Sequence, residues 1–279
     1  MDTLPKLFRS LPLFKGKERL ARLLFKGRIA RDHRFWVKGT FGCEYLVPNL
    51  VENIGFEIFI NGIYEEETSD FIARRLPPGG VFLDLGANIG AISVPLHKKR
   101  KDITMVCVEA EPRIFSYLQE NLNRNGVMNV HAVNNALFYN DNEEMNFFSP
   151  EDKFGKGSLS PVFTDKAVKV TTVKVDTLID RLSLPTPAFI KIDVEGYEYH
   201  VFKGATALLS RADAPDILFE FADWAEEHAE GIAIGAAQQQ LFDLGYRLFY
   251  FNSTGKMEEL KEVLKKGFFM LFATKKGSI

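Results

Sequence analysis

The 279-residue sequence contains only two cysteines, Cys43 and Cys107, and no apolar run that approaches the ~20 residues of a membrane-spanning helix. So little cysteine excludes a small scaffold held together by disulfides. Cys107 lies inside an apolar stretch, so we expect buried, reduced thiols, which favour a cytoplasmic location. The charged start is not followed by the apolar segment of a signal peptide. With 46% hydrophobic and 26% charged residues, the sequence is typical of a globular protein.

The net charge of −2 conceals a basic N-terminal arm on an acidic body. Residues 1–40 contain eleven Lys and Arg against three Asp and Glu, whereas the rest of the chain has 24 bases and 34 acids. Leu20, Leu23 and Leu24 recur at helical spacing among the bases, which predicts a basic amphipathic helix over residues 15–31. Two interpretations stay open. The helix contacts a membrane surface or another polyanion, or it packs on the body through its leucines.

The sequence predicts two parts. Residues 1–63 are expected to form the basic arm and a small β-rich cap, because Phe56–Ile60 followed by Asn61-Gly62 is a hairpin signal. Residues 64–279 are expected to form one catalytic domain, in which strand and helix patterns alternate from residue 81 onward. Such alternation is typical of a mostly parallel, doubly wound α/β sheet.

The expected elements follow the apolar patterns of this second part. Seven strands are predicted at residues 81–85, 103–108, 130–133, 189–192, 217–221, 248–251 and 268–272. Helices are predicted at residues 112–125, 197–210 and 236–244. About residues 140–175 break the alternation and predict an inserted hairpin on the carboxyl edge of the sheet, where ligands of this fold class bind.

The most informative segment runs from Asp84 to Gly90 (Asp-Leu-Gly-Ala-Asn-Ile-Gly) at the end of the first buried strand. Glycines in such a turn allow backbone to approach a ligand closely, and the following helix offers free N–H groups. The dinucleotide fingerprint G-x-G-x-x-G is absent. Asp84 would repel a pyrophosphate but suits a ligand with a cationic amino group.

A second acid, Glu109, ends the next strand nineteen residues after Gly90. A carboxylate in that position can accept hydrogen bonds from both hydroxyls of a ribose. The glycine turn and Glu109 together therefore indicate a site for a nucleoside-containing cofactor.

These residues resemble the S-adenosylmethionine site of class I methyltransferases. Tyr64-Glu65, the glycine turn, Val108-Glu109-Ala110-Glu111-Pro112 and Ile190-Lys191-Ile192-Asp193-Val194-Glu195-Gly196-Tyr197-Glu198 together resemble the FkbM methyltransferase family, over about residues 62–222. The resemblance implies a Rossmann-like class I fold with a seven-stranded sheet. It also implies S-adenosylmethionine-dependent O-methylation of a sugar, glycolipid or small natural-product hydroxyl.

The resemblance also implies which residues form the site. Asp193 and Glu195 are the candidates for a general base or for orienting the acceptor, since a hydroxyl must lose its proton during methylation. The alternative for Asp193 is that it caps the next helix. Ser158 and Glu220 are candidates for acceptor binding. The candidates for cofactor binding are Tyr64, Glu65, Asp84, Gly86, Ala87, Asn88, Gly90, Glu109, Ala110, Asn135 and Ala136.

The sequence also bears on three alternatives. Asp193, Glu195, Glu198 and His200 suggest a divalent cation, but adjacent positions at a helix start do not converge, so no metal is assigned. Glu198 and His200 are instead expected on the helix surface. An NAD-dependent oxidoreductase lacks support, because the dinucleotide fingerprint is missing. An RNA methyltransferase that uses the basic arm is the main alternative, although the acidic body makes a nucleic-acid partner unexpected. The sequence sets neither the acceptor nor the oligomeric state.

Overall fold

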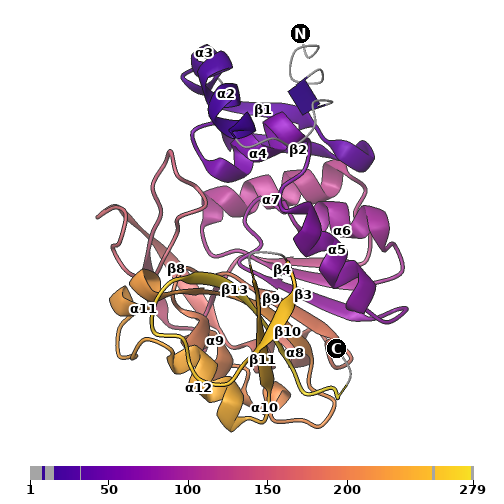
Figure 1. Cartoon of the computed structure of the whole chain (residues 1–279), viewed down its shortest axis with the longest axis vertical. Helices are drawn as coiled ribbons and strands as arrows, with labels where there is room; N and C mark the ends of the chain where they lie inside the picture. The colour runs from indigo at the N-terminus through magenta and orange to yellow at the C-terminus, as the bar shows by residue number, and fades with distance from the viewer. Residues whose placement is uncertain (1–7, 10–15, 32, 253–254, 278–279) are drawn as a thin grey trace.

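Eight strands form one sheet at the centre of the protein (Figure 1). The computed structural model describes residues 8–9, 16–31, 33–252 and 255–277. The strands are β3 (Val81–Leu85), β4 (Thr104–Val108), β5 (Val130–Val133), β9 (Phe189–Ile192), β10 (Asp216–Ala222), β11 (Arg247–Phe251), β12 (Met257–Leu260) and β13 (Phe268–Thr274). The seven strands expected from the sequence are all present, and β12 adds an eighth at one edge.

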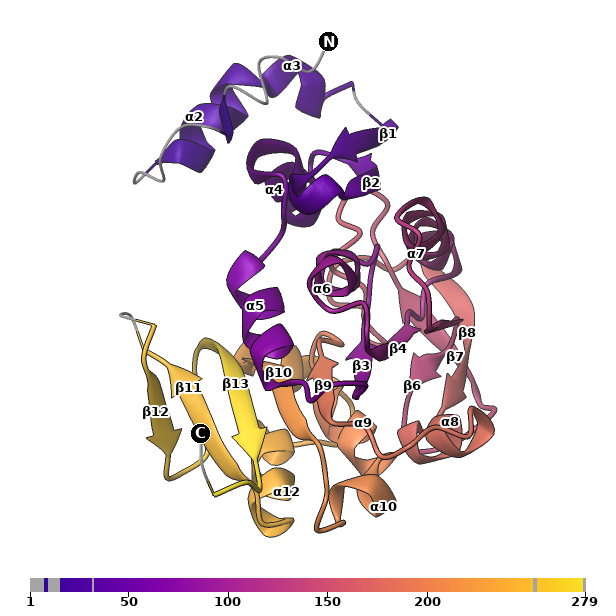
Figure 2. The ribbon, with the colours of Figure 1, turned by 90° about the vertical axis from the view of Figure 1, so that its right-hand side faces the viewer.

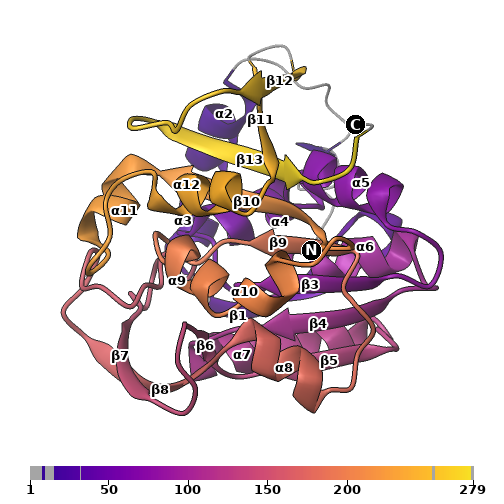
Figure 3. The same cartoon turned by 90° about the horizontal axis from the view of Figure 1, so that it is seen from below.

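The order of the strands is β12-β11-β13-β10-β9-β3-β4-β5, which Figure 3 shows from top to bottom. Strands β10, β9, β3, β4 and β5 pair in parallel, and β13 runs antiparallel between β10 and β11. This arrangement confirms the doubly wound, Rossmann-like prediction. The chain leaves β3 toward β4 and β5 and later returns to β9 on the other side. A crevice is expected at this reversal, outside the carboxyl ends of β3 and β9.

Helices cover both faces of the sheet (Figure 2). One face carries α5 (Glu66–Arg75), α6 (Ser93–Lys99) and α7 (Pro112–Arg124), and the other carries α8 (Val175–Arg181), α9 (Glu198–Lys203), α10 (Thr206–Leu209) and α12 (Ala236–Asp243). Side chains alternate between the faces. Phe82 and Phe189 belong to the first apolar core, whereas Leu83 and Ile190 belong to the second. Burial on both faces explains why the strands are almost continuously apolar.

Two of the predicted helices are confirmed and one is interrupted. In α7, the Glu111 side chain accepts hydrogen bonds from the N–H groups of Arg113 and Ile114, which caps the helix start. The helix predicted at 197–210 is instead α9 and α10, separated at Gly204. A Cβ on Gly204 would lie 2.2 Å from the carbonyl oxygen of Phe138, so the interruption coincides with a close approach of two backbone segments.

The hairpin predicted at Phe56–Gly62 is wrong, because this segment belongs to helix α4 (Asn53–Asn61). The Asn-Gly pair that suggested a hairpin turn ends the helix instead. Gly62 has φ 83, and its N–H donates to the Ile58 carbonyl at 2.9 Å. The β structure of this region comes from the antiparallel pair β1 (His33–Lys38) and β2 (Glu44–Asn49), joined by the 3-10 turn η1 (Thr40–Gly42).

The predicted basic helix is broken into α2 (Lys17–Leu24) and α3 (Lys26–Ile29), with Phe25 between them. Residue 15 lies outside the described residues. The leucines do not face the body, since Leu20, Leu23 and Leu24 are 41%, 71% and 57% exposed. Ala21 and Phe25 are buried in their place. The interpretation that this helix packs through its leucines is therefore wrong, and the division at residue 63 stays a prediction.

The segment predicted as an inserted hairpin takes part in a second, smaller sheet. It consists of β6 (Ala136–Leu137), β8 (Ala167–Val173) and β7 (Glu144–Phe148) in that order, with β7 antiparallel to β8. Elsewhere in the fold, Cys43 and Cys107 are both buried and free, as expected. Within the described residues, none of the helices combines the length and the apolarity that crossing a membrane requires.

Candidate active site

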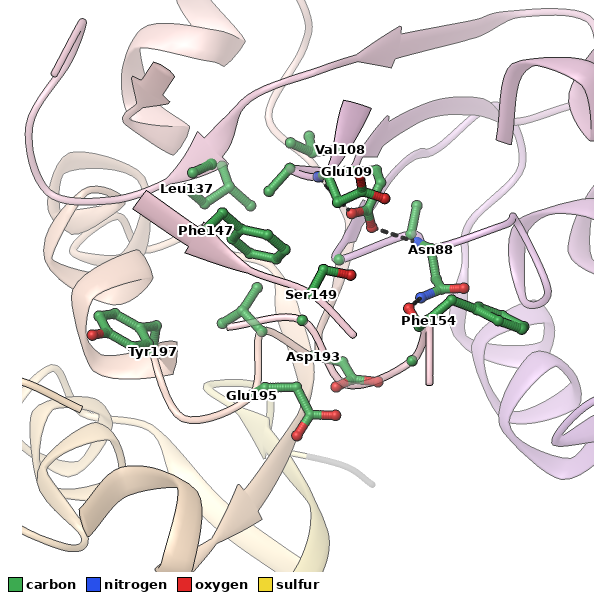
Figure 4. Close-up of a pocket in the computed structure, with 18 of the residues that line it drawn as sticks. Asn88, Val108, Glu109, Leu137, Phe147, Ser149, Phe154, Asp193, Glu195 and Tyr197 are labelled. Atoms are coloured by element: carbon green, nitrogen blue, oxygen red, sulfur yellow. Dashed lines mark hydrogen bonds between the residues drawn. The ribbon is translucent and has the colours of Figure 1, made fainter. Parts of the chain in front are cut away.

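A pocket lies at the carboxyl ends of β3, β4 and β9, where the loop between β7 and β8 forms another wall (Figure 4). Its position is that of the crevice expected from the strand order. Ten of the residues predicted for the site line this pocket: Tyr64, Gly86, Ala87, Asn88, Glu109, Ala110, Asn135, Ala136, Asp193 and Glu195.

Five predicted residues lie near the pocket without lining it: Glu65, Asp84, Gly90, Ser158 and Glu220. Glu65, with φ 41, is the N-cap residue of α5, and Gly90, with φ 81, closes the glycine turn. The Ser158 hydroxyl donates to the carbonyl oxygen of Glu195 at 3.1 Å, which ties the β7–β8 loop to the turn after β9. In this structure Ser158 thus connects two walls of the site.

Gly86 explains how the turns after β3 and β9 come so close. A Cβ on Gly86 would lie 1.9 Å from the carbonyl oxygen of Asp193, and the backbone of Gly86 has φ 81. The Asp193 N–H donates to the Leu85 carbonyl at 3.0 Å. A side chain at position 86 would separate the two turns, so glycine is needed for both its conformation and its size.

Glu109 is held by backbone donors on two sides. Its Oε2 accepts from the N–H of Asn88 at 3.0 Å, and its Oε1 accepts from the N–H of Glu111 at 2.9 Å. Burial raises the pKa of this carboxyl to about 7, although these two hydrogen bonds oppose the shift. The Asn88 side chain donates to the Phe154 carbonyl at 2.9 Å, so the same turn also anchors the β7–β8 loop.

Lys191 is a buried charge at the site that was not among the residues predicted from the sequence. It pairs in register with Asp84 on the neighbouring strand, and its ammonium lies 3.2 Å from Asp193 Oδ2 and 4.0 Å from Asp84 Oδ1. Burial alone would lower the pKa of Lys191, but the charges of Asp193 and Asp84 outweigh it and raise the pKa. A single lysine inside the apolar run 189–192 was the signal that could have identified this residue.

Asp84 lies behind the pocket wall. It is fully buried, and its Oδ2 accepts a hydrogen bond from the hydroxyl of Ser93. Burial raises the pKa of this carboxyl, whereas the Lys191 ammonium lowers it. Asp84 therefore does not contact the pocket itself, but its charge acts on Lys191, which lines the pocket.

Asp193 and Glu195, at one end of the pocket, form a cluster of carboxylates with Glu220, which does not line it. Oxygen atoms of Asp193, Glu195 and Glu220 lie within 4.8 Å of one another. Burial, followed by the nearby Asp193 charge, raises the pKa of both Glu195 and Glu220. Glu195 is only 6% exposed, and its Oε2 has no hydrogen-bond partner within the part of the chain that the structure describes.

Asp193 does not cap the helix that follows it. Helix α9 begins at Glu198, and its N-cap residue Tyr197 makes no side-chain cap. The N–H of Val194 donates instead to Glu198 Oε1 at 3.0 Å. Asp193 pairs with Lys191 and is not a helix cap. Glu198 and His200, expected on the surface, are buried because α9 packs them against the body of the protein.

Lys156, in the β7–β8 loop, meets the acidic cluster from the other side. Its Nζ lies 2.8 Å from Glu195 Oε1 and within 6 Å of two aromatic rings, at 5.9 Å from the centroid of Phe163 and 5.6 Å from that of Trp224. The two rings contact each other edge to face, with their centroids 5.5 Å apart. Trp224 and Glu195 are distant in sequence from Lys156 and Phe163 and meet them only in the folded chain, so no sequence pattern identified this group.

The strand order, the glycine turn and the acid after β4 define a Rossmann-like enzyme with a site for a nucleoside cofactor, as in class I methyltransferases. The family model for the methyltransferase FkbM domain matches residues 84–248, more than half of the chain. The protein therefore belongs to the FkbM methyltransferase family, and its methyl donor is S-adenosylmethionine.

Three known proteins illustrate the similarity. The hexuronic acid methyltransferase AglP of Haloferax volcanii is 26% identical over 145 residues, which are 52% of this chain and 58% of that relative. The match thus spans less than two thirds of the relative. A precorrin-6y C5,15-methyltransferase from Geobacter metallireducens is 15% identical, with a TM-score of 0.45 and coverage of 77% and 90% of the two chains. A TehB-like SAM-dependent methyltransferase from Corynebacterium glutamicum is 14% identical, with a TM-score of 0.46 and coverage of 80% and 94%.

Proposed function

We propose that this protein transfers the methyl group of S-adenosylmethionine to a hydroxyl oxygen of a sugar, either free or within a glycan or glycolipid. The observation that carries the proposal is the group of three carboxylates, of which Asp193 and Glu195 line one end of the pocket and Glu220 lies beside them. A hydroxyl is a weak nucleophile that needs a base as its oxygen forms the new bond. The similarity to a hexuronic acid methyltransferase supports a sugar as the acceptor.

The pocket residues fit the donor. Glu109 uses one lone pair of each oxygen for a backbone N–H and keeps further acceptor capacity for ribose hydroxyls. The Ser149 hydroxyl, which also lines the pocket, is buried and has no hydrogen-bond partner among the described residues. We assign the ribose to Glu109 and the adenine to Ala110, Asn135 and Ala136. The turn at Gly86 would then hold the methionine part, next to Asp193.

Bound in this way, S-adenosylmethionine supplies a methyl group on a positively charged sulfur. A carboxylate of the cluster would take the proton of the acceptor hydroxyl as its oxygen receives the methyl group, and the sulfur would keep the electrons of the broken carbon–sulfur bond. Glu195 suits this role, because its raised pKa moves a carboxyl of ordinary pKa 4.5 in the direction of neutral pH. Asp193, held by Lys191, would orient the acceptor.

The aromatic pair beside Lys156 completes the acceptor side. Phe163 is 38% exposed, and Trp224 is partly exposed next to it. Aromatic faces of this kind can bury the apolar C–H face of a sugar ring, while Lys156 and Glu195 offer a donor and an acceptor for its hydroxyls. Glu220, further along the same cluster, would contact a neighbouring hydroxyl.

The test is a methyl-transfer assay with isotopically labelled S-adenosylmethionine, followed by mass spectrometry to locate the label. The acceptors are a hexuronate, a neutral hexoside and an RNA of mixed sequence. We expect label on a sugar hydroxyl as a methyl ether, which survives mild alkali. Release of the label as methanol would show a carboxylate ester instead. Transfer to RNA alone, lost on deletion of residues 1–34, would favour the RNA methyltransferase and contradict the proposal.

A further inference from the structure

Helix α2 presents its apolar side to solvent. Leu20, Leu23 and Leu24 lie on one side of this helix at 41%, 71% and 57% exposure, and we call them the leucine face. The side toward the body buries Ala21 and the following Phe25. Figures 1 and 2 show α2 and α3 as the outermost layer of the protein, on the far side of α4 from the sheet. An amphipathic helix with its apolar side outward is unusual for a surface that contacts only water.

The charges around the leucine face are nearly all positive. Residues 16–31 contain six bases and one acid, Glu18. Glu18 is already paired with Arg22, at 2.9 Å between Oε1 and Nε. Arg19 and Lys26 are exposed on the same segment as the leucines. This surface therefore combines exposed leucines with an excess of cations. The leucines match the acyl chains of an anionic bilayer, and the cations match its headgroups.

We infer that α2 docks the protein on an anionic lipid bilayer, with the leucine face in the boundary of the acyl chains and Arg19 and Lys26 at the lipid phosphates. Both features of the surface favour binding to a bilayer, because the leucines enter the acyl boundary while the cations remain among the headgroups. A nucleic acid would satisfy the cations only and would leave the leucines in water. Exposed leucines therefore favour the bilayer.

The docking surface is structurally linked to the pocket. The Arg22 guanidinium donates to Asn53 Oδ1 at 3.2 Å and lies 4.3 Å from the centroid of the Phe56 ring, so α2 is fixed on α4. Ile54, which follows Asn53 in α4, lines the pocket. Docking would thus hold the pocket one helix away from the bilayer. Combined with the proposed function, on which this step rests, the arrangement favours an acceptor sugar attached to a lipid.

The experiment is sedimentation of the full chain with two kinds of vesicle, phosphatidylcholine alone and phosphatidylcholine with phosphatidylglycerol. We expect binding to the anionic vesicles that weakens as salt rises, since screening acts on exposed charges. Leu23→Ser with Leu24→Ser should weaken this binding at least about tenfold. The matched control is Met128→Ser, which changes a residue that is 69% exposed after α7 and should leave binding unchanged.

A second pair of variants separates charge from apolar contact. Arg19→Gln with Lys26→Gln should weaken binding and flatten its dependence on salt. Affinity for S-adenosylhomocysteine, measured by calorimetry on each variant, should stay at the wild-type value and reports the methyltransferase site independently. Absence of binding to anionic vesicles, or binding that the leucine substitutions do not change, would overturn the inference while leaving the proposed function intact. Binding to RNA without binding to vesicles would likewise overturn it.

Discussion

The ammonium of Lys156 lies 2.8 Å from one oxygen of the Glu195 carboxylate, whose other oxygen is buried without a hydrogen-bond partner in the described residues. Lys156 comes from the inserted loop and Glu195 from the turn after β9, so this ion pair joins the acceptor side of the pocket to the sheet. The pairing also sets the charge of the proposed base. The Lys156 charge favours ionised Glu195, whereas burial and Asp193 favour its neutral form.

Replacing Lys156 with methionine should shift the pH dependence of the reaction. Without the ammonium, the pKa of Glu195 rises further, so the base is protonated up to a higher pH. We expect the acidic limb of the kcat/KM profile to move to higher pH. Lys153→Met, an exposed lysine of the same loop, is the control and should keep the wild-type profile. An unshifted limb in Lys156→Met would remove Glu195 from the role of base.

Substitutions of Asp193 and Glu109 should have different effects, the first mainly on turnover and the second mainly on cofactor affinity. Asp193→Asn keeps an oxygen toward Lys191 but loses the charge, so affinity for S-adenosylhomocysteine should persist while kcat falls by about 10²-fold or more. Glu109→Gln should lower the affinity for S-adenosylhomocysteine more than it lowers kcat. The substitution places an amide donor against one of the two backbone N–H groups that now donate to Glu109. Calorimetry and steady-state rates measure both. Equal loss of affinity in the two variants would contradict the assigned roles.

Gly86→Ala should disrupt the site more than backbone strain alone explains. An added Cβ would lie 1.9 Å from the Asp193 carbonyl oxygen. Gly79 also has a positive φ, 69, but a Cβ there meets nothing within 4 Å. Gly79→Ala should therefore cost only about 1 kcal/mol in the free energy of unfolding. We expect Gly86→Ala to lose cofactor affinity and thermal stability well beyond this control. Similar behaviour of the two variants would show that the close contact with Asp193 is unimportant.

Glu198 should make stability depend on pH. Burial raises its folded-state pKa from 4.5 to about 8, so the neutral carboxyl stabilises the fold at low pH. That stabilisation is lost as pH rises from about 4.5 through about 8. Glu198→Gln keeps the acceptor for the Val194 N–H and removes the titration. Its Tm should match wild type at pH 4 and exceed it by roughly 5 °C at pH 8.5. Exposed Glu67→Gln is the control. A constant difference between wild type and Glu198→Gln at both pH values would refute the argument.

The sequence predicted the sheet well because buried parallel strands leave a strong local signal. Each central strand is a short apolar run, and the acid or glycine that follows it marks the carboxyl edge. Nine of the ten predicted site residues that line the pocket follow β3, β4, β5 or β9, at the same edge of the sheet. The tenth, Tyr64, lies between helices α4 and α5.

The rest depends on contacts that no local pattern encodes. Asn61-Gly62 is a hairpin signal in isolation, but here the pair ends a helix, and only Gly62 takes the left-handed conformation. Lys156, Phe163 and Trp224 meet through an inserted loop and a helix far apart in sequence. The outward direction of Leu23 was equally inaccessible, because helical spacing defines an apolar side and not what it faces.

The central claim is that the Asp193 end of the pocket receives the methyl group that is transferred to the acceptor oxygen. A crystal structure with S-adenosylhomocysteine tests this most directly, because it shows where the sulfur lies. We predict the sulfur beside the carboxylates of Asp193 and Glu195, with the ribose on Glu109 and the adenine against Ala110. A ligand in the reverse orientation, or bound outside this pocket, would contradict the account.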